Sequence, residues 1–142
     1  MSDQFKALIL NQDGENFTRE IKSIEKNFLK HGDVTVKVNY SGLNYKDSLI
    51  LKNGARLVKE FPHIPGIDFS GVVEESNHKN FKPGDEIILT GWRVGEIFYG
   101  GYAQYAKVNG DFLVKKPKNY HLLLRIVNNH QNKFRLLSSL LK

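Results

Sequence analysis

Two short polar segments, about twenty residues apart, carry the side chains that are best suited to chemistry. Residues 44–47 (Asn-Tyr-Lys-Asp) follow a glycine-containing turn, and Asp68 follows the turn Pro65-Gly66 near the start of a second apolar segment. Amide, phenol, ammonium and carboxylate groups bind polar substrates through hydrogen bonds and charge. Because binding residues are commonly carried on loops that a stiff β scaffold positions, the two segments predict a substrate cleft.

The flanking sequence predicts short strands joined by glycine and proline turns. Val34 and every second residue up to Tyr40 fall on one face, which is the period of two typical of a strand. Gly71, in the middle of another strand, indicates a bulge or a close backbone contact. Further strands are predicted over residues 5–10, 16–24, 66–75, 86–90, 102–108 and 112–114, and one short helix over residues 46–52. Many short strands with such turns predict a mainly β fold, either a barrel or a sandwich.

Length and composition narrow the class of protein. The chain of 142 residues is long enough for one domain with its own hydrophobic core. It contains no cysteine, which excludes disulfides and thiolate metal sites. No signal peptide is evident and no apolar run is long enough to cross a membrane, so we expect a soluble cytoplasmic protein.

The charge of the chain is divided unevenly along its length. Residues 1–114 carry a net charge of −1, whereas residues 115–142 hold seven basic residues and no acidic one. The formal net charge of +6 therefore belongs to the C-terminal part. We place the boundary close to Pro117, with a domain over residues 1–118 and a tail over residues 119–142.

Four motifs in a fixed order resemble one enzyme family. They are Ser41–Asp47, Phe61–Asp68, the turn Pro83-Gly84-Asp85, and Gly100–Ala103. Together they resemble the N-terminal, GroES-like catalytic domain of the medium-chain dehydrogenase/reductases. That resemblance implies a partly open β-barrel with short helices. Residues 44–47 and 89–96 are further similar to the zinc-independent branch of acrylyl-CoA reductases and quinone oxidoreductase-like proteins.

The resemblance implies an NADPH-dependent reductase of activated C=C bonds, with an enoyl-CoA such as acrylyl-CoA, or a quinone, as the small-molecule substrate. The nicotinamide would supply the hydride, and hydrogen-bond donors of the protein would stabilise the developing enolate charge. Asn44 and Tyr45 are the implied catalytic residues, the first as an amide donor and the second as a hydroxyl donor and proton source. The further candidates for facing substrate or cofactor are Lys46, Asp47, Asp68, Trp92 and Arg93.

Each candidate also has a purely structural interpretation. Asn44 can fill a turn position with an unusual φ, and Tyr45 can lie at the edge of the core with its hydroxyl bonded to the backbone. Asp47 can serve the first turn of a helix, and Asp68 can be buried and hydrogen-bonded for stability. Trp92 can pack under its loop instead of lining a substrate site. The residues alone leave these alternatives open.

The resemblance also implies which cofactors to expect. Zinc-dependent relatives place metal ligands where this sequence has Asn44, Ile67 and Asp68, and because neither Asn nor Ile is an effective zinc ligand we expect no metal. The family's nucleotide-binding domain would follow residue 118, where no glycine fingerprint occurs. We therefore expect a truncated domain that does not bind NADPH alone. Activity would then require a separate nucleotide-binding domain or a homodimer.

Residues 119–142 are basic and rich in leucine, unlike the family. A basic amphipathic helix is one option for this tail, because one set of its residues recurs at spacings of three and four: Leu123, Val127, His130, Phe134, Leu137 and Leu141. A second functional class therefore stays open, namely a non-catalytic interaction module that uses the tail. The body has no basic stripe with interleaved aromatic residues, so nucleic acid is not an expected partner. Membrane contact by the tail is not expected either.

Overall fold

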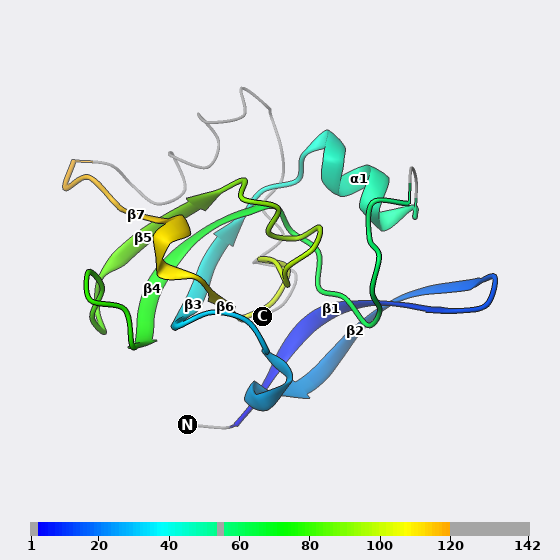
Figure 1. The fold of residues 1–142 in the computed structure, drawn as a ribbon, viewed down its shortest axis with the longest axis horizontal. Helices are drawn as coiled ribbons and strands as arrows, with labels where there is room; N and C mark the ends of the chain where they lie inside the picture. Colours follow the sequence, from blue (N-terminus) through cyan, green and yellow to red (C-terminus); the bar gives the residue numbers. More distant parts are fainter. Residues whose placement is uncertain (1–2, 54–55, 120–142) are drawn as a thin grey trace.

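The computed structural model describes residues 3–53 and 56–119, and most of this part is β structure (Figure 1). The strands are β1 (Gln4–Asp13), β2 (Asn16–Glu25), β3 (Val34–Ser41), β4 (Asp68–Ser76), β5 (Glu86–Thr90), β6 (Tyr105–Val108) and β7 (Leu113–Lys115). The described helical segments are α1 (Tyr45–Leu51) and the 3-10 turns η1 (Lys26–Phe28) and η3 (Gly110–Phe112). The predicted mainly β fold class is confirmed. The helix considered for the tail falls on residues outside the described part.

The strands form a five-stranded antiparallel sheet and a separate hairpin. The sheet order is β6-β3-β4-β5-β7, and β1 and β2 form a two-stranded sheet of their own. Figure 1 shows this long hairpin lying beside the sheet, with α1 above the hairpin in this view, beyond the end of β3. Two isolated bridges, Ala7 with Ala103 and Leu10 with His63, join β1 to the rest of the domain. The arrangement is that of a partly open, GroES-like barrel, as the motifs imply.

The β1–β2 hairpin extends further than the sequence predicts. The strand expected over residues 5–10 continues to Asp13, which pairs with Asn16, and the turn consists of Gly14 and Glu15 alone. Gly14 has φ +61°, a left-handed value that favours glycine. The last residues of the strand are polar and exposed, so they contribute no core contact. Backbone pairing between the strands does not require buried apolar side chains. A prediction from the alternation of apolar residues therefore underestimates the length of the strand.

The core of the sheet follows only part of the predicted periodicity. Val34 and Val36 are fully buried, but Val38 and Tyr40 are only half-buried. A register shift between Val38 and Tyr40 places an extra residue in β3, and such a bulge changes which face the following side chains occupy. The apolar residues around Val34 include Phe69, Val73, Ile87, Leu89, Val94, Ala106, Val108 and Leu113.

The outer strand β7 closes one edge of the sheet with charged pairs. Its Val114 side chain is 62% exposed. The ammonium of Lys115 lies 3.6 Å from Asp85, and that of Lys116 lies 2.6 Å from Glu86. Cationic side chains therefore flank the exposed backbone of the last strand.

Substitution of Gly71 tests how tightly β3 and β4 approach. A Cβ atom at this position would meet the backbone carbonyl oxygen of Lys37 at 2.1 Å, a contact that only backbone movement can relieve. We expect Gly71→Ala to lower the free energy of unfolding by about 3 kcal/mol in a urea titration. The control is Gly84→Ala, whose Cβ would meet open space but whose φ is +96°, with an expected loss of about 1 kcal/mol. Equal losses in the two variants would contradict the close approach.

Candidate functional site

The two polar segments predicted from the sequence meet at one end of the sheet. Ser41, the last residue of β3, pairs with Phe69 near the start of β4. Its Oγ atom also donates a hydrogen bond of 3.0 Å to the carbonyl oxygen of Asp68. Because α1 begins a few residues after Ser41, the pairing brings residues 44–47 next to Asp68. The strand ends therefore position this cluster.

Asn44 links the two carboxylates of the cluster. Its Nδ2 atom donates to Asp47 Oδ2 and to Asp68 Oδ2, each at 3.0 Å. Its backbone N–H donates to Asp47 Oδ2 at 2.9 Å, within a capping box at the start of α1. All three residues are buried. Both amide hydrogens of Asn44 are thus directed to carboxylates, which differs from the predicted role as a donor to a substrate carbonyl.

Backbone groups complete the hydrogen bonding of the two carboxylates. Ile67 N donates to Asp47 Oδ1 at 3.0 Å, and Gly42 N donates to Asp68 Oδ1 at 3.1 Å. Buried carboxylates need such donors because burial disfavours the charged form. Burial raises the pKa of Asp47 and the nearby charge of Asp68 adds to this rise, while the hydrogen bonds from Asn44 and Ile67 oppose it. The structural interpretations of Asp47 and Asp68 therefore agree with their contacts.

Tyr102 is a member of the cluster that the sequence prediction missed. Its hydroxyl donates to the carbonyl oxygen of Gly42 at 2.8 Å, and its side chain is buried. Burial, together with the charges of Asp47 and Asp68, raises the pKa of Tyr102 well above its ordinary value. The phenol therefore keeps its proton and serves to hold the loop after β3. The only sequence signal was its place in the Gly100–Ala103 motif.

Tyr45 is presented to solvent by the same cluster. It is the first residue of α1 and is 75% exposed, so the alternative in which it lies at the core edge is wrong. The alternative in which Asn44 fills a turn with an unusual φ is also wrong, since its φ is −110°. The Tyr45 hydroxyl is therefore accessible to solvent. The residue before it, Asn44, is held in place by its hydrogen bonds to two carboxylates.

A second polar group surrounds Glu96. Lys46 Nζ lies 3.1 Å from Glu96 Oε2, and an Arg93 guanidinium nitrogen lies 3.2 Å from Glu96 Oε1. Burial alone would raise the pKa of Glu96, but the hydrogen bonds and charges of Lys46 and Arg93 outweigh it and lower the pKa below the usual value. The two cations remain largely exposed around this carboxylate. Both cations were among the residues predicted from the sequence, but Glu96 was not. The one feature of the sequence that could have indicated Glu96 is its position three residues after Arg93, a spacing that allows an ion pair.

The loop that carries Arg93 has an unusual backbone. Trp92 and Arg93 have φ values of +59° and +61°, between Gly91 and Gly95, which both have φ +80°. Consecutive non-glycine residues in this region are held only where the surrounding structure determines them. Trp92 is 59% exposed and its ring stacks on Phe112, with centroids 5.1 Å apart. Trp92 therefore covers Phe112 and leaves one side accessible.

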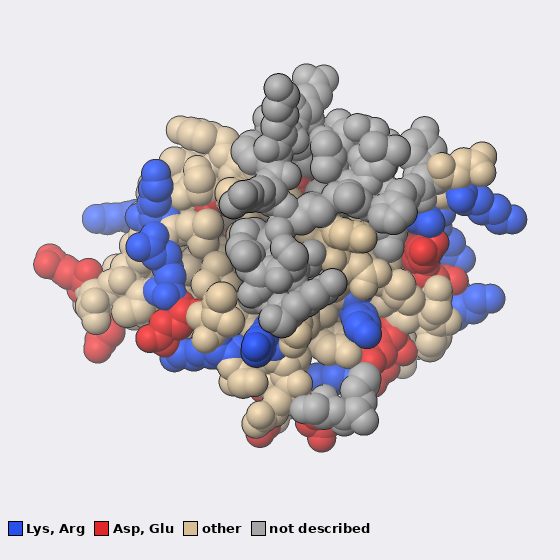
Figure 2. Space-filling view, turned by 180° about the vertical axis from the view of Figure 1, so that it is seen from behind, with Lys and Arg blue, Asp and Glu red and all other residues tan. Residues whose placement is uncertain are grey.

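Some expected features can be examined only within the described residues. No three His, Asp or Glu side chains there gather as metal ligands. Within residues 3–53 and 56–119, no helix is long and apolar enough to cross a membrane. On the face shown in Figure 2, basic and acidic side chains are interspersed.

The fold and the clustered strand ends define a GroES-like β domain with a polar, partly solvent-facing site. Residues 30–118 match the alcohol dehydrogenase GroES-like domain, and the chain belongs to that family. Its relatives by sequence include proteins named as an acrylyl-CoA reductase and as a putative quinone oxidoreductase.

One relative by sequence is the acrylyl-CoA reductase AcuI of Ruegeria pomeroyi, which is 47% identical over 116 residues. Among solved structures, the YhdH oxidoreductase of Salmonella enterica in complex with NADP is 42% identical, with a TM-score of 0.83 over 86% of this chain. The Bacillus subtilis protein YhfP with NAD bound is 40% identical, with a TM-score of 0.84 over 89% of this chain.

The chain spans only part of each relative. The matched segment covers 80% of this chain but 35% of the Ruegeria reductase. It covers 38% of the Salmonella chain and 38% of the Bacillus chain. The ligands and activities of those longer proteins therefore do not by themselves describe this chain.

Substitutions at neighbouring positions separate the roles of Asn44 and Tyr45 in stability. Asn44→Ala removes donors from two buried carboxylates, and we expect it to lower the free energy of unfolding by about 3 kcal/mol. Tyr45→Ala, at an exposed side chain, should change it by less than about 0.5 kcal/mol. Chemical denaturation followed by circular dichroism measures both. A neutral Asn44→Ala variant would contradict the bridging role.

His63 should make stability depend on pH. Its side chain is buried and its Nε2–H donates to the carbonyl oxygen of Gly95 at 2.7 Å. Burial lowers the pKa of His63, although the Gly95 hydrogen bond and the Glu96 charge oppose this. The folded state therefore binds a proton less readily than the unfolded state. Its contribution to stability is present above the unfolded pKa of about 6.5 and is lost as pH falls through the lowered folded pKa.

The measurement is the free energy of unfolding at several pH values from 8 downward, compared with His63→Gln. We expect the difference between the two proteins to shrink as the pH falls below about 6.5. A difference that stays constant would show that His63 does not titrate as its burial requires.

Proposed function

We propose that this chain is the substrate-side half of an NADPH-dependent reductase of activated C=C bonds. The enoyl thioester acrylyl-CoA is the preferred substrate class, and a quinone is the second. The 47% identity to the acrylyl-CoA reductase of Ruegeria carries the proposal. The NADP complex of the Salmonella relative supports the choice of cofactor.

In this proposal Tyr45 is the group that contacts substrate. Its exposed hydroxyl would donate a hydrogen bond to the substrate carbonyl, where negative charge develops during reduction, and it could deliver the proton that completes the reaction. Bound NADPH supplies the hydride. Asn44 acts as a positioning residue, because its contacts to two carboxylates fix the first turn of α1 from which Tyr45 projects.

The cations around Glu96 fit the same substrate class. Lys46 and Arg93 each keep at least half of their side-chain surface exposed while contacting one buried carboxylate. An ammonium and a guanidinium group so placed suit the phosphate groups of a coenzyme A thioester. We assign them to substrate binding, together with Trp92, whose exposed face can pack against an apolar part of the substrate.

Catalysis requires a nucleotide-binding partner in this proposal. The relatives with bound NADP or NAD are more than twice as long as the matched segment. A separate nucleotide-binding domain would have to meet the surface that carries Tyr45 and Arg93. Alone, the 142-residue chain should show no NADPH binding at micromolar concentrations.

The test compares the 142-residue chain with a chimera that joins residues 1–118 to the unmatched remainder of the Ruegeria reductase. We expect NADPH-dependent reduction of acrylyl-CoA by the chimera and none by the chain alone. Tyr45→Phe in the chimera should lower kcat at least about tenfold, because it removes the hydroxyl donor. Tyr99→Phe is the matched control, since the Tyr99 ring is buried against Phe28 and should tolerate the change.

Two results would contradict the proposal. Saturable micromolar binding of NADPH to the isolated chain would show that no partner domain is needed for the cofactor. Unchanged turnover of the Tyr45→Phe chimera would remove Tyr45 from the reaction. Loss of activity in the Tyr99→Phe control would indicate a general effect on the fold.

A further inference from the structure

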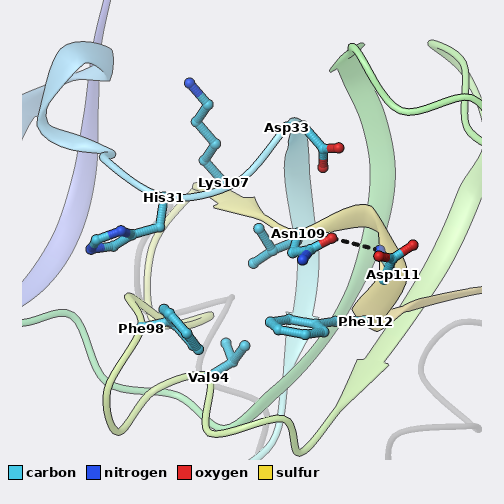
Figure 3. Close-up of a pocket in the computed structure, with 10 residues that line it drawn as sticks. His31, Asp33, Val94, Phe98, Lys107, Asn109, Asp111 and Phe112 are labelled. Carbon is cyan, nitrogen blue, oxygen red and sulfur yellow. Dashed lines mark hydrogen bonds between the residues drawn. The ribbon is translucent and has the colours of Figure 1, made fainter.

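A cavity of about 480 Å³ lies beside the proposed substrate site, since Phe112 lines it and stacks on Trp92 (Figure 3). It is bounded by the segment that leads into β3, the end of β6, η3 and the loop that follows β5. The lining residues are His31, Gly32, Asp33, Val94, Phe98, Lys107, Val108, Asn109, Asp111 and Phe112. None of them belongs to the Asn44–Asp68 cluster or to the group around Glu96. Its volume falls in the range of small-molecule sites.

The interior of this cavity is apolar and largely aromatic. Two of its lining residues, Val94 and Val108, are buried. Figure 3 shows Phe98, Val94 and Phe112 along one wall, with His31 at one side. The His31 ring meets Phe98 edge-on, with centroids 5.8 Å apart. Such a wall offers ring faces and edges to a flat ligand, and aromatic contacts of this kind add to the free energy of burial.

The charged groups of the cavity are at its rim and offset one another. Asp33 Oδ1 accepts a hydrogen bond of 2.8 Å from Gly110 N, and Asp111 Oδ1 lies 2.9 Å from His78 Nε2. In Figure 3 the side chains of Lys107 and Asp33 extend away from Phe98 and Phe112. One cation and two carboxylates with partners therefore give no strong preference for a charged ligand. Desolvating a charge against the apolar wall would be unfavourable.

We propose that this cavity is a second binding site, for a neutral planar aromatic molecule that carries a hydrogen-bonding group such as an amide. The ring would lie against Phe98 and Phe112, and the amide would reach the polar rim formed by His31 and Asn109. The proposal does not depend on the reductase function, because it is argued from the lining of the cavity alone; the two sites touch where Trp92 stacks on Phe112.

The loop after β5 connects this second site to the first. Val94 and Phe98 line the cavity, while Arg93 and Glu96 of the same loop contact each other, and Glu96 contacts Lys46 on α1. A ligand that packs against Phe98 therefore touches the loop that holds the cations of the proposed reductase site.

The test is a titration of the 15N-labelled 142-residue chain, followed by amide chemical shifts, with three compounds that share a bicyclic ring. These are 2-naphthamide, which is neutral, 2-naphthoate and 2-naphthylmethylamine. We expect saturable shifts at residues that line the cavity, such as Gly32, Val94 and Val108, with 2-naphthamide binding at least tenfold tighter than either charged compound. Equal or tighter binding of a charged compound would overturn the proposal, as would shifts centred on Tyr45 or the absence of saturation.

Variants locate the binding. Phe98→Ala removes part of the wall and should weaken 2-naphthamide binding at least tenfold, whereas Ile97→Ala, next to it on the exposed side of the loop, should leave binding unchanged. His31→Ala is the second variant, at an exposed residue whose loss does not threaten the fold, with Lys30→Ala as its control. We expect a weakening of about threefold for His31→Ala. Equal effects in variants and controls would overturn the assignment.

Discussion

Two buried carboxylates held by one amide are the interaction on which the site depends. Asp47 belongs to α1 and Asp68 to β4, and Asn44 donates a hydrogen bond to each. A carboxylate that stays buried without donors costs several kcal/mol, so the Asn44 amide stabilises the contact between the helix and the strand. The backbone of Tyr45, the adjacent residue, is consequently fixed while its side chain stays accessible. The neighbouring residues Asn44 and Tyr45 thus have different roles: Asn44 fixes the backbone, and Tyr45 presents its hydroxyl to solvent.

The loop after β5 extends this constraint across the domain. Glu96 contacts Lys46 on α1, and two residues of the same loop form part of the cavity wall. Its left-handed residues Trp92 and Arg93 are kept in place by contacts at both ends, the Phe112 stacking on one side and the Glu96 ion pair on the other. A single loop therefore sets the geometry of two chemically different surfaces.

The fold class was accessible from the sequence because alternation and turn residues are local signals. The meeting of residues 44–47 with Asp68 was also accessible, since the first segment follows the end of one strand and Asp68 begins another. Partners distant in the sequence were not: Lys46 and Glu96 are 50 residues apart, and Tyr102 and Gly42 are 60 apart. Residue type identified Asn44 as a donor, but only the folded geometry shows which acceptors it reaches. The bulge in β3 was missed for the same reason, because it depends on pairing with β4.

The short outer strand β7 has a consequence for how copies of the protein behave together. An outer strand exposes unpaired backbone groups that can recruit a strand from another molecule. Here Lys115 and Lys116 stand beside the exposed Val114, paired with acidic residues of the neighbouring turn and strand. For another copy to pair with this edge, these charged side chains would have to lose water, which disfavours such pairing. Because dissolved salt screens such charges, the solubility of the protein should depend on ionic strength as well as on its sequence.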